Sequence, residues 1–133
     1  MMDGTNIPMG IPTDAPARGA QQLPQSLLAV AALVAQLPPA SRAHITGLYL
    51  DTLHTGRDQV EQALAACDHA QFQAVAHRIA GAAAMMQDSE LSQVFRQMEL
   101  ASRDQGLLPA APGWQAACAL LTRTLDWLQS TSP

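Results

Sequence analysis

The chain has 133 residues, of which 48% are apolar and only 14% are charged, and its formal net charge at neutral pH is −4. This length suits one domain with a tail, and the apolar content excludes a wholly disordered protein. The negative charge, without any run of basic residues, argues against a nucleic-acid partner and against an anionic membrane surface.

Three features of the sequence bear on the compartment of the protein. Cys67 and Cys118 lie far apart and lack metal-ligand spacing, so a reducing environment is the default. The longest apolar run, residues 27–35, is too short to span a bilayer. Residues 1–26 have a net negative charge, where a signal peptide would be positive. We therefore expect a cytoplasmic protein. Because free cysteine behaves as a small apolar residue, we also expect both cysteines at buried positions.

Proline and glycine divide the chain into a tail and a helical region. Residues 1–22 contain several of both without apolar periodicity, which predicts a flexible tail, and residues 23–133 are expected to form the folded domain. Helical periodicity and end signals predict five helices in that domain, at residues 24–36, 41–67, 68–86, 88–105 and 114–128.

Each predicted helix has a single apolar stripe, and the connections between the helices are short. These features predict an all-α fold, an antiparallel up-down four-helix bundle with a short N-terminal helix packed across it. Ser41 and Asp68 are suited to cap the second and third helices. Asp88 and Glu90 open the fourth, where acids favour the helix dipole, and capping is the expected role for them. A bend or break is expected near Gly56.

The third predicted helix places one histidine outward among small side chains, although an exposed helical histidine is most often only a surface residue. Its buried arc is expected to consist of Phe72, Val75, Ile79, Ala82, Ala83 and Met86. His77 lies nearly opposite this arc and is expected to point into solvent. Its neighbours on the outer face are mostly small: Ala70, Ala74, Ala80, Gly81 and Ala84, with Gln73 and Arg78 at the margins. Such small side chains would let another protein approach the histidine, although high helix propensity alone also explains the alanines.

From His77 onward the chain reads H-R-I-A-G-A-A-A-M-M-Q-D-S-E-L-S-Q-V-F-R-Q-M-E. This segment resembles the signature of histidine-containing phosphotransfer (HPt) domains, roughly H-x-L-K-G-S-S-x-x-L-G-A-x-x-L followed by an L-E pair. The matching positions are His77, Ile79, Gly81, Ala82, Ala83, Met86, Leu91, Met98 and Glu99, in register without a gap. The likeness extends more weakly over residues 41–130 and implies the same antiparallel bundle.

Two departures from that signature matter for the chemistry. Ala80 stands where the family has a lysine, and Gln87 stands where it has a glycine. Loss of the lysine removes a cation beside the phosphoryl group, and Arg78 could replace it only by curling back toward His77. Slower transfer, a shorter-lived phosphohistidine and an inactive module are all compatible with this change.

The resemblance implies a histidine phosphocarrier in a two-component phosphorelay. One ring nitrogen of His77 would attack an aspartyl phosphate on a response-regulator receiver domain, and the group would later pass to another receiver aspartate. Mg²⁺ would belong to the receiver, so the chain is expected to need no metal or cofactor and not to be an enzyme. The surface next to the phosphate, or docking the partner, would comprise Gln73, Ala74, Arg78, Ala80, Gly81 and Ala84.

Other functions stay open at this point. The missing lysine favours a phosphorylation-independent module that docks on a receiver or sensor kinase, and the chain could also be the terminal segment of a hybrid sensor histidine kinase. An enzyme with its own active site ranks last, because no nucleophile–base pair or carboxylate dyad stands out. No chemical role is expected for the remaining histidines (His44, His54 and His69), and the core is expected to hold Met85, Met86 and Met98.

Overall fold

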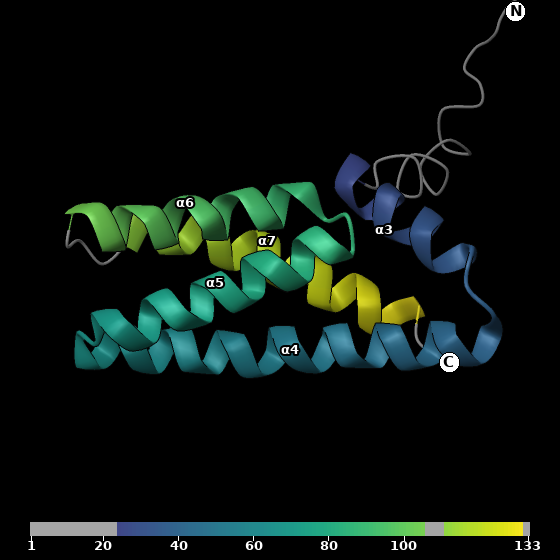
Figure 1. Cartoon of the computed structure of the whole chain (residues 1–133), viewed down its shortest axis with the longest axis horizontal. Coiled ribbons are helices and arrows are strands. Elements are labelled where there is room, and N and C mark those ends of the chain that lie inside the picture. The colour runs from purple at the N-terminus through teal and green to yellow at the C-terminus, as the bar shows by residue number, and fades with distance from the viewer. Residues whose placement is uncertain (1–23, 106–110, 132–133) are drawn as a thin grey trace, which may run out of the picture.

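The computed structural model describes residues 24–105 and 111–131, so the tail expected at residues 1–22 lies outside the described part. The described residues form five helices and no strand (Figure 1). These helices are α3 (Gln25–Ala35), α4 (Pro39–Ala66), α5 (His69–Met85), α6 (Ser89–Gln105) and α7 (Ala111–Thr131). The predicted all-α class is confirmed.

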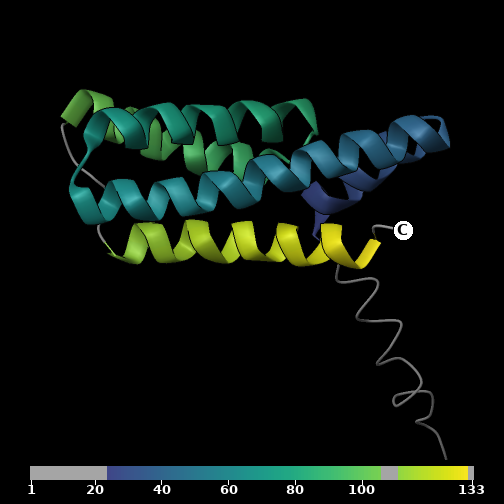
Figure 2. The same cartoon turned by 90° about the horizontal axis from the view of Figure 1, so that it is seen from below.

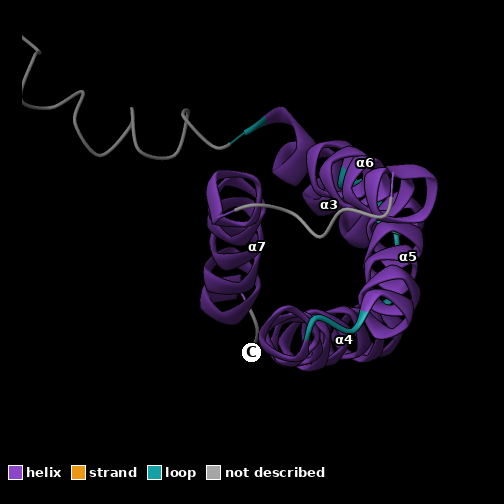
Figure 3. Ribbon diagram, turned by 90° about the vertical axis from the view of Figure 1, so that its left-hand side faces the viewer, coloured by secondary structure: helices purple, strands orange, loops and turns teal. Residues whose placement is uncertain are grey.

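Helices α4 to α7 surround a common core in chain order, as the end-on view shows (Figure 3). Each helix packs against the next, and α7 closes the ring against α4. Short α3 lies at the end of the bundle where α4 begins (Figures 1 and 2). Its Leu27 and Val30 are buried there. The bundle with an additional N-terminal helix is therefore as predicted. Within the described residues, no helix combines the length and the apolar character that crossing a membrane requires.

Helix α4 differs from its predicted form in two ways. It begins at Pro39, with Pro38 as the preceding cap residue, so Ser41 lies inside the helix and does not cap it. Proline suits this first position because it has no N–H to leave unpaired. The helix also continues through Gly56 without a break, where a Cβ atom would lie 2.8 Å from Cδ1 of buried Ile79. The glycine therefore allows α5 to pack closely against α4.

The turns on either side of α5 each contain a residue with a positive φ. Asp68 caps α5 as predicted, since its side chain accepts a hydrogen bond from the backbone N–H of Gln71 at 3.0 Å. Cys67 before it and Gln87 after α5 both adopt left-handed conformations, with φ of 52° and 63°. A glycine at position 87, as in the HPt signature, would avoid a cost of roughly 1 kcal/mol that a side chain carries in this conformation.

Several predictions about burial were wrong. Cys67 is exposed because it occupies the tight turn, and Cys118 is only partly buried because Ala117 faces the core instead. Met85 is 81% exposed, whereas Met86 and Met98 are buried as predicted.

The start of α7 and the buried face of α5 also differ from the predictions. Helix α7 begins at Ala111, inside the loop that was expected to end at Gly113. On α5, Ala76 and Ala80 are buried and Ala82 is only partly so. The buried arc is shifted because α5 packs against α4 on one side and α6 on the other.

Candidate functional site

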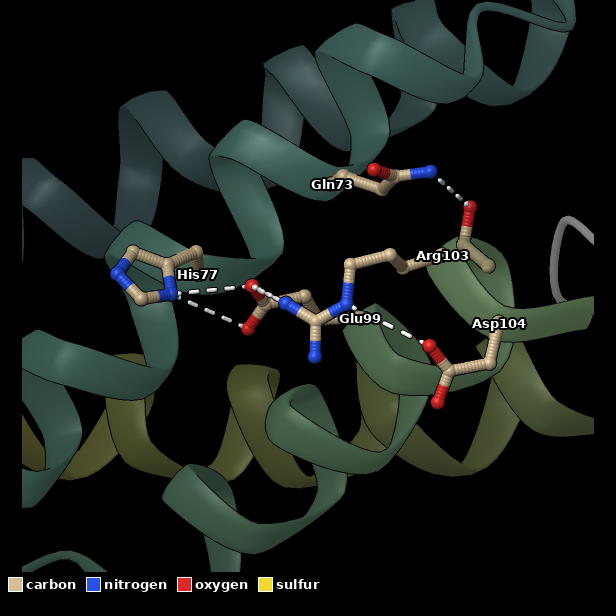
Figure 4. A network of polar contacts seen from close by, with 6 residues as sticks. Gln73, His77, Glu99, Arg103 and Asp104 are labelled. Atoms are coloured by element: carbon tan, nitrogen blue, oxygen red, sulfur yellow. Dashed lines mark hydrogen bonds and ion pairs between the residues drawn. The ribbon is translucent and has the colours of Figure 1, made fainter. Parts of the chain in front are cut away.

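His77 lies near the middle of α5 with 75% of its side chain exposed, as predicted. Its Nδ1 atom lies 3.0 Å and 3.2 Å from the two carboxylate oxygens of Glu99 on α6 (Figure 4). A carboxylate can only accept, so Nδ1 must be the protonated nitrogen in this hydrogen bond. In the neutral ring, Nε2 then carries the lone pair, and this atom has no hydrogen-bond partner among the described residues.

Glu99 is held more firmly than the histidine that it contacts. Its side chain is only 13% exposed, and Oε2 also lies 3.8 Å from Nη1 of Arg103, one turn further along α6. The Nε atom of Arg103 lies 3.5 Å from Asp104. Figure 4 shows the imidazole, the carboxylate and the guanidinium side by side on the surface of the α5–α6 pair. Glu99 is thus a partly buried anchor that orients an exposed imidazole.

The small residues around His77 lie mostly where the sequence predicted. Ala74, Gly81 and Ala84 are exposed on the same helix, and a Cβ atom added to Gly81 would meet nothing within 4 Å. Ala80 is a correction, because only 7% of it is exposed and its carbonyl accepts a hydrogen bond from Ser92 of α6 at 3.1 Å. A lysine at this position would have to extend outward from the α5–α6 contact.

The two polar residues predicted at the margins are both engaged by other helices. Gln73 donates to Ser102 of α6 at 3.2 Å. Arg78 donates to Gln59 of α4 at 2.9 Å and so does not curl back toward His77. The structure therefore leaves Arg78 on the α4 side of α5, away from the Glu99 side.

Sequence reasoning missed the α6 side of this network, above all Glu99 and Arg103. Glu99 was matched to the family signature without a role. The helix-hairpin register contains the signal that could have found it, because residues at equal distances from a tight turn face each other in antiparallel helices. His77 and Glu99 are equally far from Asp88 at the α5–α6 turn, and Gln73 and Ser102 are nearly so.

A second polar cluster lies inside the bundle. Asp88, expected to cap α6, is instead fully buried, and its Oδ2 accepts hydrogen bonds from the hydroxyls of Tyr49 at 2.9 Å and Thr124 at 3.2 Å. Its Oδ1 has no hydrogen-bond partner. Burial, and then the charge of Asp88, raise the pKa of Tyr49 far above its usual value. This carboxylate joins α4 and α7 to the start of α6 and is sealed from any partner.

Glu90 likewise does more than favour the start of α6. Its carboxylate accepts hydrogen bonds from Ser26 of α3 at 3.1 Å and from Arg123 of α7 at 3.3 Å. Ser26 is buried, so this contact helps to hold α3 against the bundle.

Comparison with protein families agrees with this arrangement. The family model of the Hpt domain matches residues 44–131, about two thirds of the chain, including all of α5 and α6. The chain therefore belongs to the Hpt domain family, whose members act in phosphotransfer in two-component systems. It shows no significant match to a curated protein or to a solved structure.

Proposed function

We propose that the chain is a histidine phosphocarrier that relays a phosphoryl group between receiver-domain aspartates, with His77 as the residue that carries the group. One observation supports this proposal above all. The imidazole at the family's histidine position is exposed, and its Nδ1 lies 3.0 Å from the Glu99 carboxylate. The proton therefore stays on Nδ1, and the lone pair of Nε2 is available for attack.

In the proposed step, the Nε2 lone pair attacks the phosphorus of an aspartyl phosphate on the receiver. The N–P bond forms while the bond between phosphorus and the aspartyl oxygen breaks, and its electron pair returns to the receiver carboxylate. The proton stays on Nδ1, so the ring becomes positively charged beside the Glu99 carboxylate. Because Nδ1 keeps its proton, the ring leaves as neutral imidazole when the phosphoryl group passes to a second aspartate, and this favours onward transfer.

The partner would be the receiver domain of a response regulator, a hybrid sensor histidine kinase, or both. Mg²⁺ and most of the catalytic groups would belong to that receiver, and this chain would supply the nucleophile and a docking surface. The exposed small residues Ala74, Gly81 and Ala84 leave room for a partner's backbone around His77. Exposed Met85 adds apolar area at the end of the same helix.

A phosphorylation-independent docking module is the second candidate, and one observation favours it. The family lysine is absent, and Ala80 in its place is buried against α6. Under this alternative the surface around His77 would bind a receiver or kinase without accepting the phosphoryl group.

The test is to incubate the purified protein with phosphate-labelled receiver domains and to follow the label. We expect transfer to this chain as an acid-labile, alkali-stable adduct, and its complete loss in His77→Gln. The matched control is His44→Gln, which removes another exposed histidine from α4 and should label like the wild type. Circular dichroism should be unchanged in both variants.

Two outcomes would decide against the phosphocarrier. Labelling that survives His77→Gln would refute the assignment of His77. A wild-type protein that binds a phosphorylated receiver without ever becoming labelled would establish the docking module instead.

A further inference from the structure

The described part of the chain contains six arginines, and the chain has no lysine at all. A phosphoryl group on Nε2 of His77 brings about two negative charges to the surface. It would sit on the ring whose Nδ1 lies 3.0 Å from the carboxylate of Glu99, which is itself negative. A nearby cationic side chain would reduce this repulsion, and Ala80, at the position where the family has its lysine, does not supply one.

Three of the six described arginines contact groups away from His77. Arg78 donates to Gln59 at 2.9 Å, Arg123 to Glu90 at 3.3 Å, and Arg42 to the carbonyl of Leu37 at 3.0 Å.

Arg103 alone has a described ion pair with the carboxylate that holds His77. Its Nη1 lies 3.8 Å from Glu99 Oε2, the oxygen that lies 3.0 Å from His77 Nδ1.

The two ion pairs that Arg103 forms are weak. Its Nη1 lies beyond hydrogen-bond distance of Glu99, and more than half of its side chain is exposed. Its other contact, with Asp104 at 3.5 Å, is also on the surface. Surface ion pairs of this kind contribute little free energy, so a doubly charged phosphoryl group can draw the guanidinium away from them.

We propose that Arg103 supplies the positive charge that faces the phosphoryl group of phospho-His77, in place of the lysine missing at position 80. This proposal rests on the proposed phosphocarrier function. The cation thus comes from α6 and not from the histidine helix. Arg103 exchanges its contact with Glu99 for the phosphoryl oxygens, while Glu99 keeps the Nδ1 proton.

The test loads His77 directly with phosphoramidate, a small anionic phosphodonor, so that neither a receiver nor its docking is needed. We expect Arg103→Ala to slow loading about threefold to tenfold and Arg103→Lys to restore most of the rate, because the lysine keeps the charge. The difference between Arg103→Ala and wild type should shrink in high salt, as a charge interaction requires and a packing defect does not.

Arg96→Ala is the matched control. Arg96 is also exposed on α6, three residues before Glu99, but it forms no hydrogen bond or ion pair with another described residue. Loading of this variant at the wild-type rate supports the proposal. Equal loading of Arg103→Ala and wild type, or an equal loss in Arg96→Ala, overturns it. Because phosphoramidate bypasses the receiver, either result is independent of whether a receiver phosphorylates this chain.

Discussion

Asp88 and Glu99 are both carboxylates that link neighbouring helices, but their surroundings are opposite. Asp88 is sealed in the core, where two hydroxyl groups donate to one of its oxygens. Glu99 lies at the surface edge of the α5–α6 contact, where its partner His77 is largely exposed. The same functional group therefore stabilises the bundle in one place and orients an exposed imidazole in the other. Access to solvent, and so to a partner, makes the difference.

The largest effect is expected from Asp88→Ala. The substitution leaves the hydroxyls of Tyr49 and Thr124 buried without their acceptor, which should lower the free energy of unfolding by about 2–4 kcal/mol. Urea denaturation measures this loss. Glu90→Ala is the control, since Glu90 is an exposed carboxylate on the first turn of α6 and should cost at most about 1 kcal/mol. Equal losses in the two variants would contradict a structural role that depends on burial.

In contrast to Asp88→Ala, substitution of Glu99 should lower the rate of phosphoryl transfer and leave the free energy of unfolding nearly unchanged. Glu99→Ala removes the acceptor of the Nδ1 proton, and we expect phosphoryl transfer to slow about tenfold, equivalent to about 1.4 kcal/mol. The transfer rate of Glu99→Gln should lie between those of the wild type and Glu99→Ala, because the amide oxygen of glutamine still accepts a hydrogen bond. The ¹⁵N chemical shifts of His77 should show the Nδ1-protonated tautomer in the wild type and a mixture in Glu99→Ala. An unchanged tautomer and rate would remove Glu99 from the mechanism.

The smallest expected effect is a decrease in the stability of the fold at alkaline pH. Burial and Asp88 raise the pKa of Tyr49, so the folded protein keeps the phenol proton above pH 10, where an unfolded tyrosine loses it. The unfolded state then binds fewer protons, and stability should fall by roughly 1 kcal/mol for each pH unit above about 10. This contribution is fully present below pH 10.

Tyr49 is the only tyrosine, and the chain has no lysine that titrates in the same range. Its ultraviolet absorbance can therefore be followed directly, and tyrosinate should appear only as the protein unfolds. Tyr49→Phe should lose this alkaline dependence. Ionisation of Tyr49 near pH 10 in the folded protein would show that the cluster is less sealed than its burial indicates.

The sequence was sufficient for the features that depend on local chemistry. Helical periodicity placed His77 on the outer face of its helix, and Asp68 was identified as the cap of α5, because both properties depend on residues within a few positions of each other. The sequence also predicted the class of fold, since five amphipathic segments with short connections have few ways to bury their apolar stripes.

Only the tertiary structure decided what each helix meets. It buried Ala80 against α6, turned Asp88 from an expected helix cap into a core acceptor, and brought Glu99 and Arg103 to the histidine. These outcomes depend on the register and rotation of one helix against another. That geometry follows from side-chain packing over the whole core, which periodicity within a single helix does not contain.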